Sequence, residues 1–290
     1  MASALPICYL NGAFVPIGEA RISPFDRGFL FADGVYEVVP VYAGRPFRFE
    51  DHHGRLARSL SALALDDPLG SAGWRGVASR LIEANGGGDL YLYWQITRGT
   101  ELGRNHAPLP RLPRTVFAFA APWLPTPPEV LEQGLACITA ADTRWARCDV
   151  KSVALLANVL LRQLAVDAGA AETLLLKDGE LTDASASAVH VIVDGELRTP
   201  PRSHRLLSGT TRTVIEELAQ RIGLAQRSAR VTEADLRGAQ EIWLSAATRE
   251  VVPVTRLDGR PVGPGLPGPN WRRLHAAFQD YKRELAGQPW

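Results

Sequence analysis

The chain contains 290 residues, of which 46% are hydrophobic and 22% are charged, and its formal net charge at pH 7 is +1. This length predicts roughly two domains, and the balanced charge gives no electrostatic reason to expect nucleic acid or a membrane as a partner. No run approaches the roughly 20 apolar residues of a membrane-spanning helix, and no secretory signal is apparent, so we expect a cytoplasmic protein. Three widely spaced cysteines without nearby histidines predict neither disulfides nor a metal site.

The residues before 121 predict a layer of strands with two helices. Alternating apolar residues flank Asn11-Gly12, a turn pair typical of β-hairpins. Apolar residues recur at helical spacing after Glu50 and Asp51, whose charges favour the start of a helix. The expected elements are, in chain order, a hairpin, a turn-rich segment that runs into a strand, two helices and two strands, at residues 7–17, 22–39, 49–65, 74–83, 90–97 and 116–120.

Two basic clusters in this half of the chain are candidates for anion binding. Arg55 lies in the first turns of the helix expected at 49–65, where a guanidinium can reach an anion, although a solvated surface arginine has the same pattern. Arg104 and His106 lie in a polar loop that could hold a carboxylate, although a lone basic loop is more often simply solvated.

Four prolines between residues 122 and 128 interrupt every regular pattern and indicate a domain boundary. We therefore expect an N-terminal α/β domain at residues 1–120, a linker at 121–130 and a larger C-terminal domain at 131–290. The elements expected after the linker are a strand, a long helix, a meander of strands, two helices, two strands and a terminal helix, at residues 135–140, 153–167, 172–197, 207–222, 232–236, 241–245, 251–257 and 269–285.

Lysine is scarce in this sequence, which contains only Lys151, Lys177 and Lys282, whereas arginine supplies nearly all of the positive charge. Unlike arginine, a lysine can lose its proton when it is desolvated and can form a Schiff base. Lys151 directly precedes the long helix expected at 153–167. Taken alone, this position allows two interpretations, a solvated charge at a helix start or a catalytic amine.

Two further polar segments stand out among apolar neighbours. Asp183 lies among small residues at 182–187, a pattern that is normally a turn. Gly209, Thr210 and Thr211 open a helix, so that free backbone N–H groups and hydroxyls converge at the positive end of its dipole. This arrangement can hold a phosphate, and an ordinary helix cap is the alternative.

Together these signals describe the chemistry of pyridoxal phosphate. The aldehyde of this cofactor requires a lysine amine, its phosphate requires hydrogen-bond donors, and its ring nitrogen acts as an electron sink when a carboxylate keeps it protonated. Lys151 supplies the amine, Arg55 and the helix start at Gly209 supply the phosphate donors, and Asp183 supplies the carboxylate.

Over about residues 9–278 the sequence resembles the fold-type IV pyridoxal-phosphate enzymes, or class IV aminotransferases, and within them the D-amino-acid transaminases most closely. The resemblance implies an α+β chain of two domains, a smaller N-terminal α/β domain and a larger C-terminal pseudo-barrel domain, with the cofactor between them. It also implies a homodimer. The motifs that carry it are Phe31-Ala-Asp-Gly-Val-Tyr-Glu-Val38, His52-His-Gly-Arg-Leu56, Arg147-Cys-Asp-Val-Lys-Ser152 and Ser208-Gly-Thr-Thr-Arg212.

The resemblance also implies roles for individual residues. Lys151 would be the catalytic residue and would bind the cofactor as an imine. Tyr36, Arg104 and His106 would trap the α-carboxylate of the substrate, with the Arg104 loop supplied across the dimer interface. The remaining cofactor-binding residues implied are Arg55, Asp183, Ser187, Gly209, Thr210, Thr211 and Thr248.

Three positions depart from the family pattern. Asp183 is one methylene shorter than the glutamate expected beside the ring nitrogen. Ala188 and His190 replace an asparagine and an aromatic residue, and His190 is interpreted either as a support of the site or as a core histidine. Ala247 replaces a threonine of the late phosphate loop, which leaves Thr248 and Arg249 as substitutes.

We therefore expect a transaminase that moves the amino group of a D-amino acid, such as D-alanine, to a 2-oxo acid, such as 2-oxoglutarate, in two half-reactions. The alternatives within the same fold are a branched-chain L-amino-acid transaminase, an amine transaminase and a 4-amino-4-deoxychorismate lyase. An alternative of another class is a non-catalytic relative in which the changes at Asp183 and Ala247 have weakened the cofactor site.

Overall fold

The structure is a computed structural model that describes residues 3–287, and its internal contacts divide it into two compact units. Of the described residues, the first unit contains 3–124, Val150–Ala154 and 285–287. The second contains Pro125–Asp149 and Leu155–Glu284. The short segment around Lys151 therefore belongs to the first unit, although the residues on both sides of it in the sequence belong to the second.

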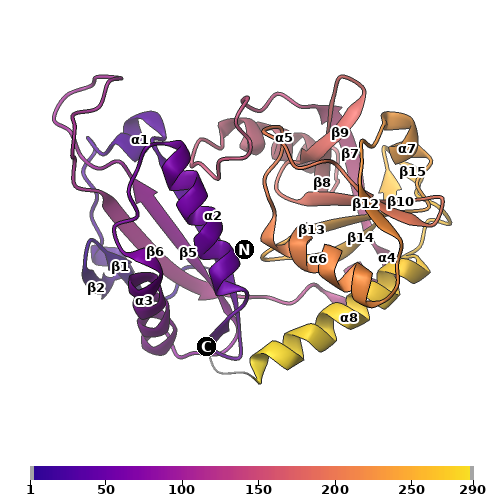
Figure 1. Cartoon of the computed structure of the whole chain (residues 1–290), viewed down its shortest axis with the longest axis horizontal. Coiled ribbons are helices and arrows are strands. Elements are labelled where there is room, and N and C mark those ends of the chain that lie inside the picture. Colours follow the sequence, from indigo (N-terminus) through magenta and orange to yellow (C-terminus); the bar gives the residue numbers. More distant parts are fainter. Residues whose placement is uncertain (1–2, 288–290) are drawn as a thin grey trace. The chain divides into compact units, whose positions relative to one another are not determined.

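A six-stranded antiparallel sheet forms the first unit, in the order β2-β1-β6-β5-β3-β4. Helices α2 and α3 lie across one face of it (Figure 1). The strands are β1 (Ile7–Leu10), β2 (Ala13–Pro16), β3 (Gly34–Tyr42), β4 (Arg45–Pro46), β5 (Leu90–Thr97) and β6 (Thr115–Pro122). The helices are η1 (Ile17–Glu19), α1 (Arg27–Phe31), α2 (Phe49–Ala62) and α3 (Gly70–Ala84).

The two faces of this sheet differ in composition because successive side chains of a strand point to opposite sides. On the face covered by the helices, Val35 and Trp94 are fully buried, and Trp94 stacks on Trp74 of α3 with 4.7 Å between ring centroids. The opposite face carries half-buried aromatic side chains, among them Tyr36 and Tyr93. This second face is where the sheet can meet a ligand.

The second unit is built on a nine-stranded mixed sheet in the order β12-β11-β10-β13-β14-β7-β8-β9, with β15 paired to β14. Helix α5 packs against β7 and β8, the two parallel strands that it connects. The strands are β7 (Leu135–Ala141), β8 (Glu172–Lys177), β9 (Glu180–Ala184), β10 (Ala188–Val193), β11 (Glu196–Thr199), β12 (Gln226–Ser228), β13 (Glu241–Ala246), β14 (Glu250–Leu257) and β15 (Arg260–Pro261). The helices are α4 (Pro128–Gln133), α5 (Leu156–Asp167), α6 (Thr210–Arg221), α7 (Glu233–Arg237) and α8 (Pro269–Ala286).

The predicted α+β class of two domains is confirmed, and the main helices and strands lie where the sequence places them. Helices α1 and α4 were not predicted, because each spans only five or six residues and gives no helical periodicity. The long helix predicted from residue 153 begins at Leu156. Within residues 3–287 no helix has the length and apolar character needed to cross a membrane.

Candidate active site

Lys151 lies on an extended segment held against both β3 and α2. Its carbonyl oxygen accepts a hydrogen bond from the backbone N–H of Tyr36 at 3.0 Å, and its own N–H donates to Ser59 Oγ at 3.1 Å. The next residue, Ser152, forms a β-bridge with Val35. The predicted position of Lys151 at a helix start is therefore wrong, because this pairing keeps the segment extended and α5 begins only at Leu156.

The amine of Lys151 lies over the ring of Tyr36, with Nζ 4.1 Å from the ring centroid. Among residues 3–287 the amine forms no hydrogen bond or ion pair, whereas Lys282 Nζ lies 2.6 Å from Glu250 Oε1. Lys151 thus has a fixed backbone and an amine that is not ion-paired with any carboxylate of the described chain. A residue that attacks an aldehyde requires both features.

Gly34 allows the Lys151 segment, β3 and β5 to approach one another. A Cβ atom at Gly34 would stand 2.6 Å from the carbonyl oxygen of Ile96, which belongs to the neighbouring strand. On the other side, the carbonyl oxygen of Gly34 accepts the N–H of Val153 at 3.1 Å. Since no side chain fits, the glycine of the Asp-Gly-Val-Tyr motif has a packing function next to the lysine.

Arg55 is buried on the helix-covered face of the sheet and is paired with Glu37. Its Nε and Nη2 donate to the two carboxylate oxygens at 2.7 and 2.8 Å, and His52 Nδ1 lies 2.9 Å from the same carboxylate. Burial acts to raise the pKa of Glu37, but Arg55 and His52 outweigh it and hold this pKa well below its usual range. The sequence did not reveal this partner, and the phosphate-binding role of Arg55 remains a prediction.

Arg104 and His106 are both exposed and both contact Phe31 at the end of α1. The distance to the Phe31 ring centroid is 5.2 Å from Arg104 Cζ and 5.4 Å from the His106 ring centroid. Tyr36 instead stacks on Tyr93 at 5.6 Å, and in the described part of the chain no interaction joins it to Arg104 or His106. The structure therefore brings two of the three predicted carboxylate-binding residues together.

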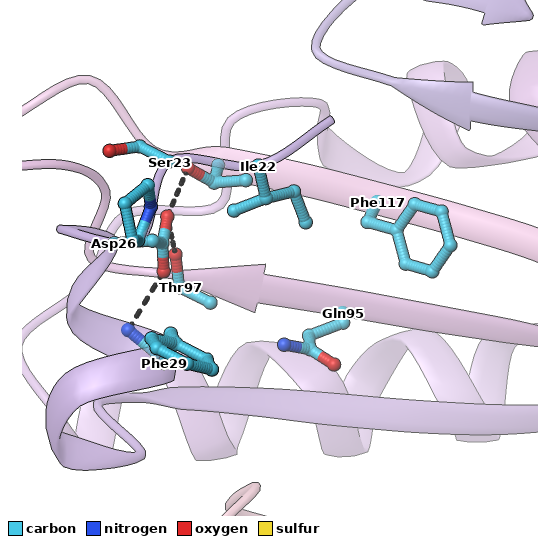
Figure 2. A pocket seen from close by; sticks show the side chains of 10 residues that line it. Ile22, Ser23, Asp26, Phe29, Gln95, Thr97 and Phe117 are labelled. Atoms are coloured by element: carbon cyan, nitrogen blue, oxygen red, sulfur yellow. Dashed lines mark hydrogen bonds between the residues drawn. The ribbon is translucent and has the colours of Figure 1, made fainter. Parts of the chain in front are cut away.

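A pocket of about 420 Å³ lies in the first unit beside Gln95, which is the strand partner of Tyr36. Figure 2 shows Asp26 next to Thr97 in this pocket, with Gln95 on another side of the same space. Asp26 is only 1% exposed and its carboxylate accepts hydrogen bonds from Thr97 and Thr115. Asp26 is therefore satisfied within the fold and serves as a structural residue of the pocket.

Asp183 lies on β9 and is held by a buried arginine. Its Oδ2 accepts a hydrogen bond from Arg144 Nη1 at 3.1 Å, and Arg144 also binds Asp142 through Nε at 3.0 Å and Nη2 at 2.9 Å. Burial raises the pKa of Asp183 to about 6, although Arg144 acts to lower it. At neutral pH the carboxyl is ionised, and a further cation beside it would lower its pKa.

Ser187 belongs to a buried polar cluster around Glu172 that the sequence did not reveal. Glu172 is fully buried, and its carboxylate accepts hydrogen bonds from Ser185 Oγ and, at 3.1 Å, from Ser187 Oγ. Arg249 Nη1 lies 3.4 Å from Glu172 Oε2 and 3.5 Å from Ser187 Oγ. The available signal was an acidic residue in an apolar strand, since Glu172 directly precedes Thr-Leu-Leu-Leu.

Gly209 caps α6, and Thr210 and Thr211 form its first turn as predicted. Gly209 has no side chain that could accept hydrogen bonds from the backbone N–H groups of this first turn, so these groups depend on other acceptors. A Cβ atom at Gly209 would lie 3.9 Å from Cβ of Ala188, the residue after Ser187. The helix start and Ser187 are therefore near one another, whereas Thr248 is exposed in the turn between β13 and β14.

His190 is a fully buried histidine of the core. Its Nε2 lies 2.9 Å from Ser245 Oγ, and no partner of Nδ1 is present among the described residues. Burial, with a further effect of Arg212, lowers the pKa of His190 to about 3. The imidazole is therefore neutral at every pH at which the protein would work.

The donor chemistry of the two units fits pyridoxal phosphate. The first unit offers the amine of Lys151, which lies over an aromatic ring rather than against a carboxylate. The second offers the helix start at Gly209 for a phosphate and the carboxylate of Asp183 for a basic ring nitrogen. Such a set suits the aldehyde, the phosphate and the pyridine nitrogen of this cofactor.

Comparisons with known proteins give the family. The family model for amino-transferase class IV matches residues 34–257. A D-alanine aminotransferase from Bacillus licheniformis is 35% identical over 93% of this chain and 95% of its own. Another from Listeria monocytogenes serotype 4b is 35% identical over 96% of this chain and 97% of its own.

Solved structures agree with this family. The branched-chain amino acid aminotransferase of Escherichia coli has a TM-score of 0.88 at 25% identity, and the match covers 95% of this chain and 94% of that one. A fold IV-transaminase from Curtobacterium pusillum has a TM-score of 0.79 at 26% identity, and the match covers 96% and 94%. The fold and site thus define an aminotransferase of fold type IV. The chain belongs to the class IV aminotransferase family, whose members use pyridoxal phosphate.

Proposed function

We propose that this protein transfers the amino group of a D-amino acid, such as D-alanine, to a 2-oxo acid, such as 2-oxoglutarate, with pyridoxal phosphate bound to Lys151. The observation that carries the proposal is the Lys151 amine, which lies 4.1 Å from the Tyr36 ring centroid without an ion-pair partner in residues 3–287. The relatives named D-alanine aminotransferase, about 35% identical over nearly the whole chain, support a D-amino acid as substrate.

Each predicted cofactor residue has a role in this proposal. Pyridoxal phosphate supplies an aldehyde for the lysine and a ring that takes up the electron pair of the substrate Cα–H bond. Asp183 holds the ring nitrogen protonated, and Arg144 orients Asp183 through the bond at 3.1 Å. The phosphate is assigned to the predicted donors Arg55, Ser187, Gly209, Thr210, Thr211 and Thr248.

Lys151 then acts as the base and acid of the reaction. With the cofactor bound, its Nζ would take up the proton of the substrate Cα and release it again within the same half-reaction. The hydrogen bonds of its backbone to Tyr36 and Ser59 fix where this amine can reach. Since such transfers require an accurate alignment of donor and acceptor, the β pairing of the Lys151 segment serves the chemistry.

The substrate carboxylate is assigned to Tyr36, Arg104 and His106. A guanidinium can hold a carboxylate through two parallel hydrogen bonds, and hydroxyl and imidazole groups add directional bonds. Within one copy of the chain Arg104 and His106 contact Phe31 rather than Tyr36. We therefore propose that a second copy supplies this loop, which makes the protein a homodimer.

An exposed apolar surface on α5 supports the homodimer. Five large apolar side chains of this 12-residue helix are at least 46% exposed: Leu156, Val159, Leu160, Leu164 and Val166. An apolar patch of this kind on a surface helix marks a contact with another protein. Sedimentation of the wild-type protein should give a dimer and Leu160→Glu a monomer, whereas a monomeric wild-type protein would overturn this assignment.

Cofactor attachment tests the proposal at Lys151. After borohydride reduction of the loaded protein, mass spectrometry should find the cofactor on the peptide that contains Lys151, and Lys151→Arg should remove this label. A label on Lys177 or Lys282 in the wild-type protein would contradict the assignment.

A panel of D- and L-amino acids with 2-oxoglutarate and pyruvate tests the substrate class. D-alanine should be consumed faster than any L-amino acid. The second candidate is a branched-chain L-amino-acid transaminase, which the similarity to the solved enzyme of Escherichia coli favours. Conversion of L-leucine without conversion of D-alanine would select this second function.

A further inference from the structure

Arg27 is a buried arginine of α1 that the proposed chemistry does not use, and it is only 4% exposed. Its Nε donates to Asp33 at 3.0 Å and its Nη1 to Glu101 at 3.1 Å. Asp33 is bound in turn by Arg98 at 2.7 and 3.1 Å. Two arginines and two acids thus form a cluster without net formal charge, in which Arg27 and Glu101 are buried and Asp33 and Arg98 are partly buried. Such pairing makes the buried charge of Arg27 tolerable.

The same guanidinium also binds the backbone of the loop that carries Arg104. Its Nη1 donates to the carbonyl oxygen of Asn105 at 2.6 Å, and its Nη2 to the carbonyl oxygen of His106 at 2.9 Å. The side chain of Glu101 is held by Arg27 as well. Arg104 therefore lies in the loop between Glu101 and Asn105, and the Arg27 side chain holds the loop at both of these places.

Phe31 connects this cluster to the exposed side chains. The Phe31 ring centroid is 4.7 Å from Arg27 Cζ and 5.2 Å from Arg104 Cζ. The rest of the loop, residues 102–110, is exposed. An exposed loop without such anchors would spread over many backbone conformations, and ordering it on binding would cost conformational entropy.

We infer that Arg27 is a positioning residue for the substrate carboxylate. It sets the place of Arg104 and His106 without touching the substrate, and it thereby sets the affinity for the amino acid and the 2-oxo acid. This inference rests on the proposed function, which assigns the carboxylate to those two residues. Lysine cannot replace Arg27, because an ammonium has three donors and cannot span two carboxylates and two carbonyl groups in one plane.

The test compares Arg27→Lys with Arg104→Gln and the double variant. Arg27→Lys should raise KM for D-alanine and for 2-oxoglutarate about 10- to 100-fold, while kcat stays within about threefold of wild type. In the Arg104→Gln background the same change should add less than about twofold, because both substitutions act on one interaction. The control is Arg21→Lys, an exposed arginine that bonds to carbonyl groups of its own turn.

Hydrogen exchange gives a readout that does not depend on activity. The backbone amides of residues 101–110 should exchange faster in Arg27→Lys than in wild type, and the exchange rates in the sheet of the first unit should be unchanged. Glu101→Gln, which keeps Arg27, should show the same effect more weakly and replaces the lysine variant if that does not fold. Unchanged exchange, or KM effects that multiply in the double variant, would overturn the inference. A wild-type protein inactive with every D-amino acid would overturn the proposed function instead, and the exchange measurement would still decide whether Arg27 holds the loop.

Discussion

Replacement of His190 by phenylalanine should remove part of the loss of stability that the protein suffers in acid. In the folded protein the pKa of His190 is lowered from 6.5 to about 3, because the ring is fully buried. The unfolded chain binds a proton near pH 6.5 and the folded chain does not, so the stabilisation is complete above pH 6.5 and is lost as the pH falls toward 3. One pKa unit corresponds to about 1.4 kcal/mol, which gives a loss of about 2 kcal/mol between pH 7 and pH 5.

Urea unfolding at pH 7, 6 and 5 measures this effect. The free energy of unfolding of His190→Phe should fall by about 2 kcal/mol less than that of wild type over this range. At pH 7 the variant loses the hydrogen bond to Ser245 and should be less stable by about 1 kcal/mol. The control is Gly18→Ala, where the added Cβ meets no atom within 4 Å and no titratable group is changed, so its curve should stay parallel to that of wild type. Parallel curves for wild type and His190→Phe would refute the reasoning.

Substitutions at two further positions, Gly34 and Asp183, test the site. Gly34→Ala should destabilise the protein by about 2 kcal/mol or more, because the added Cβ would stand 2.6 Å from the Ile96 carbonyl oxygen. The control Gly18→Ala meets no atom within 4 Å and should be tolerated. Equal melting temperatures of the two variants would refute this account of Gly34. Asp183→Asn should lower kcat about 100-fold, while Asp183→Glu should retain activity. The protonated ring nitrogen beside Asp183 would hold the pKa of this carboxyl below the value of about 6 that burial gives it, so wild-type activity should fall only at a pH below 6. Unaltered kcat in Asp183→Asn would count against its role at the ring nitrogen.

Sequence patterns identified the elements that carry the candidate site residues but not the contacts that fix them. The strand with Tyr36 and the helix that begins after Gly209 were predicted because apolar periodicity and turn residues are local signals. The conformation at Lys151 was not, because it depends on hydrogen bonds to Tyr36 and Ser59, which are distant in the chain. A helix pattern directly after the lysine gave the wrong local structure.

Buried charges were the other feature that the sequence did not reveal. Arg55 has the same appearance in sequence whether it faces solvent or, as in the structure, Glu37. Glu172 and Arg249 come together from strands and turns far apart in the chain, so neither residue alone predicts the pair. Pairing of this kind is set by tertiary packing, which a local pattern does not record.

A single turnover with D-alanine tests the central claim most directly. The protein loaded with pyridoxal phosphate and mixed with D-alanine in the absence of any 2-oxo acid should form one pyruvate for each Lys151, and L-alanine and L-leucine should give no oxo acid on the same timescale. Lys151→Arg should give none with any of the three. Stoichiometric oxo acid from L-leucine and none from D-alanine, or pyruvate from D-alanine in Lys151→Arg, would contradict the account.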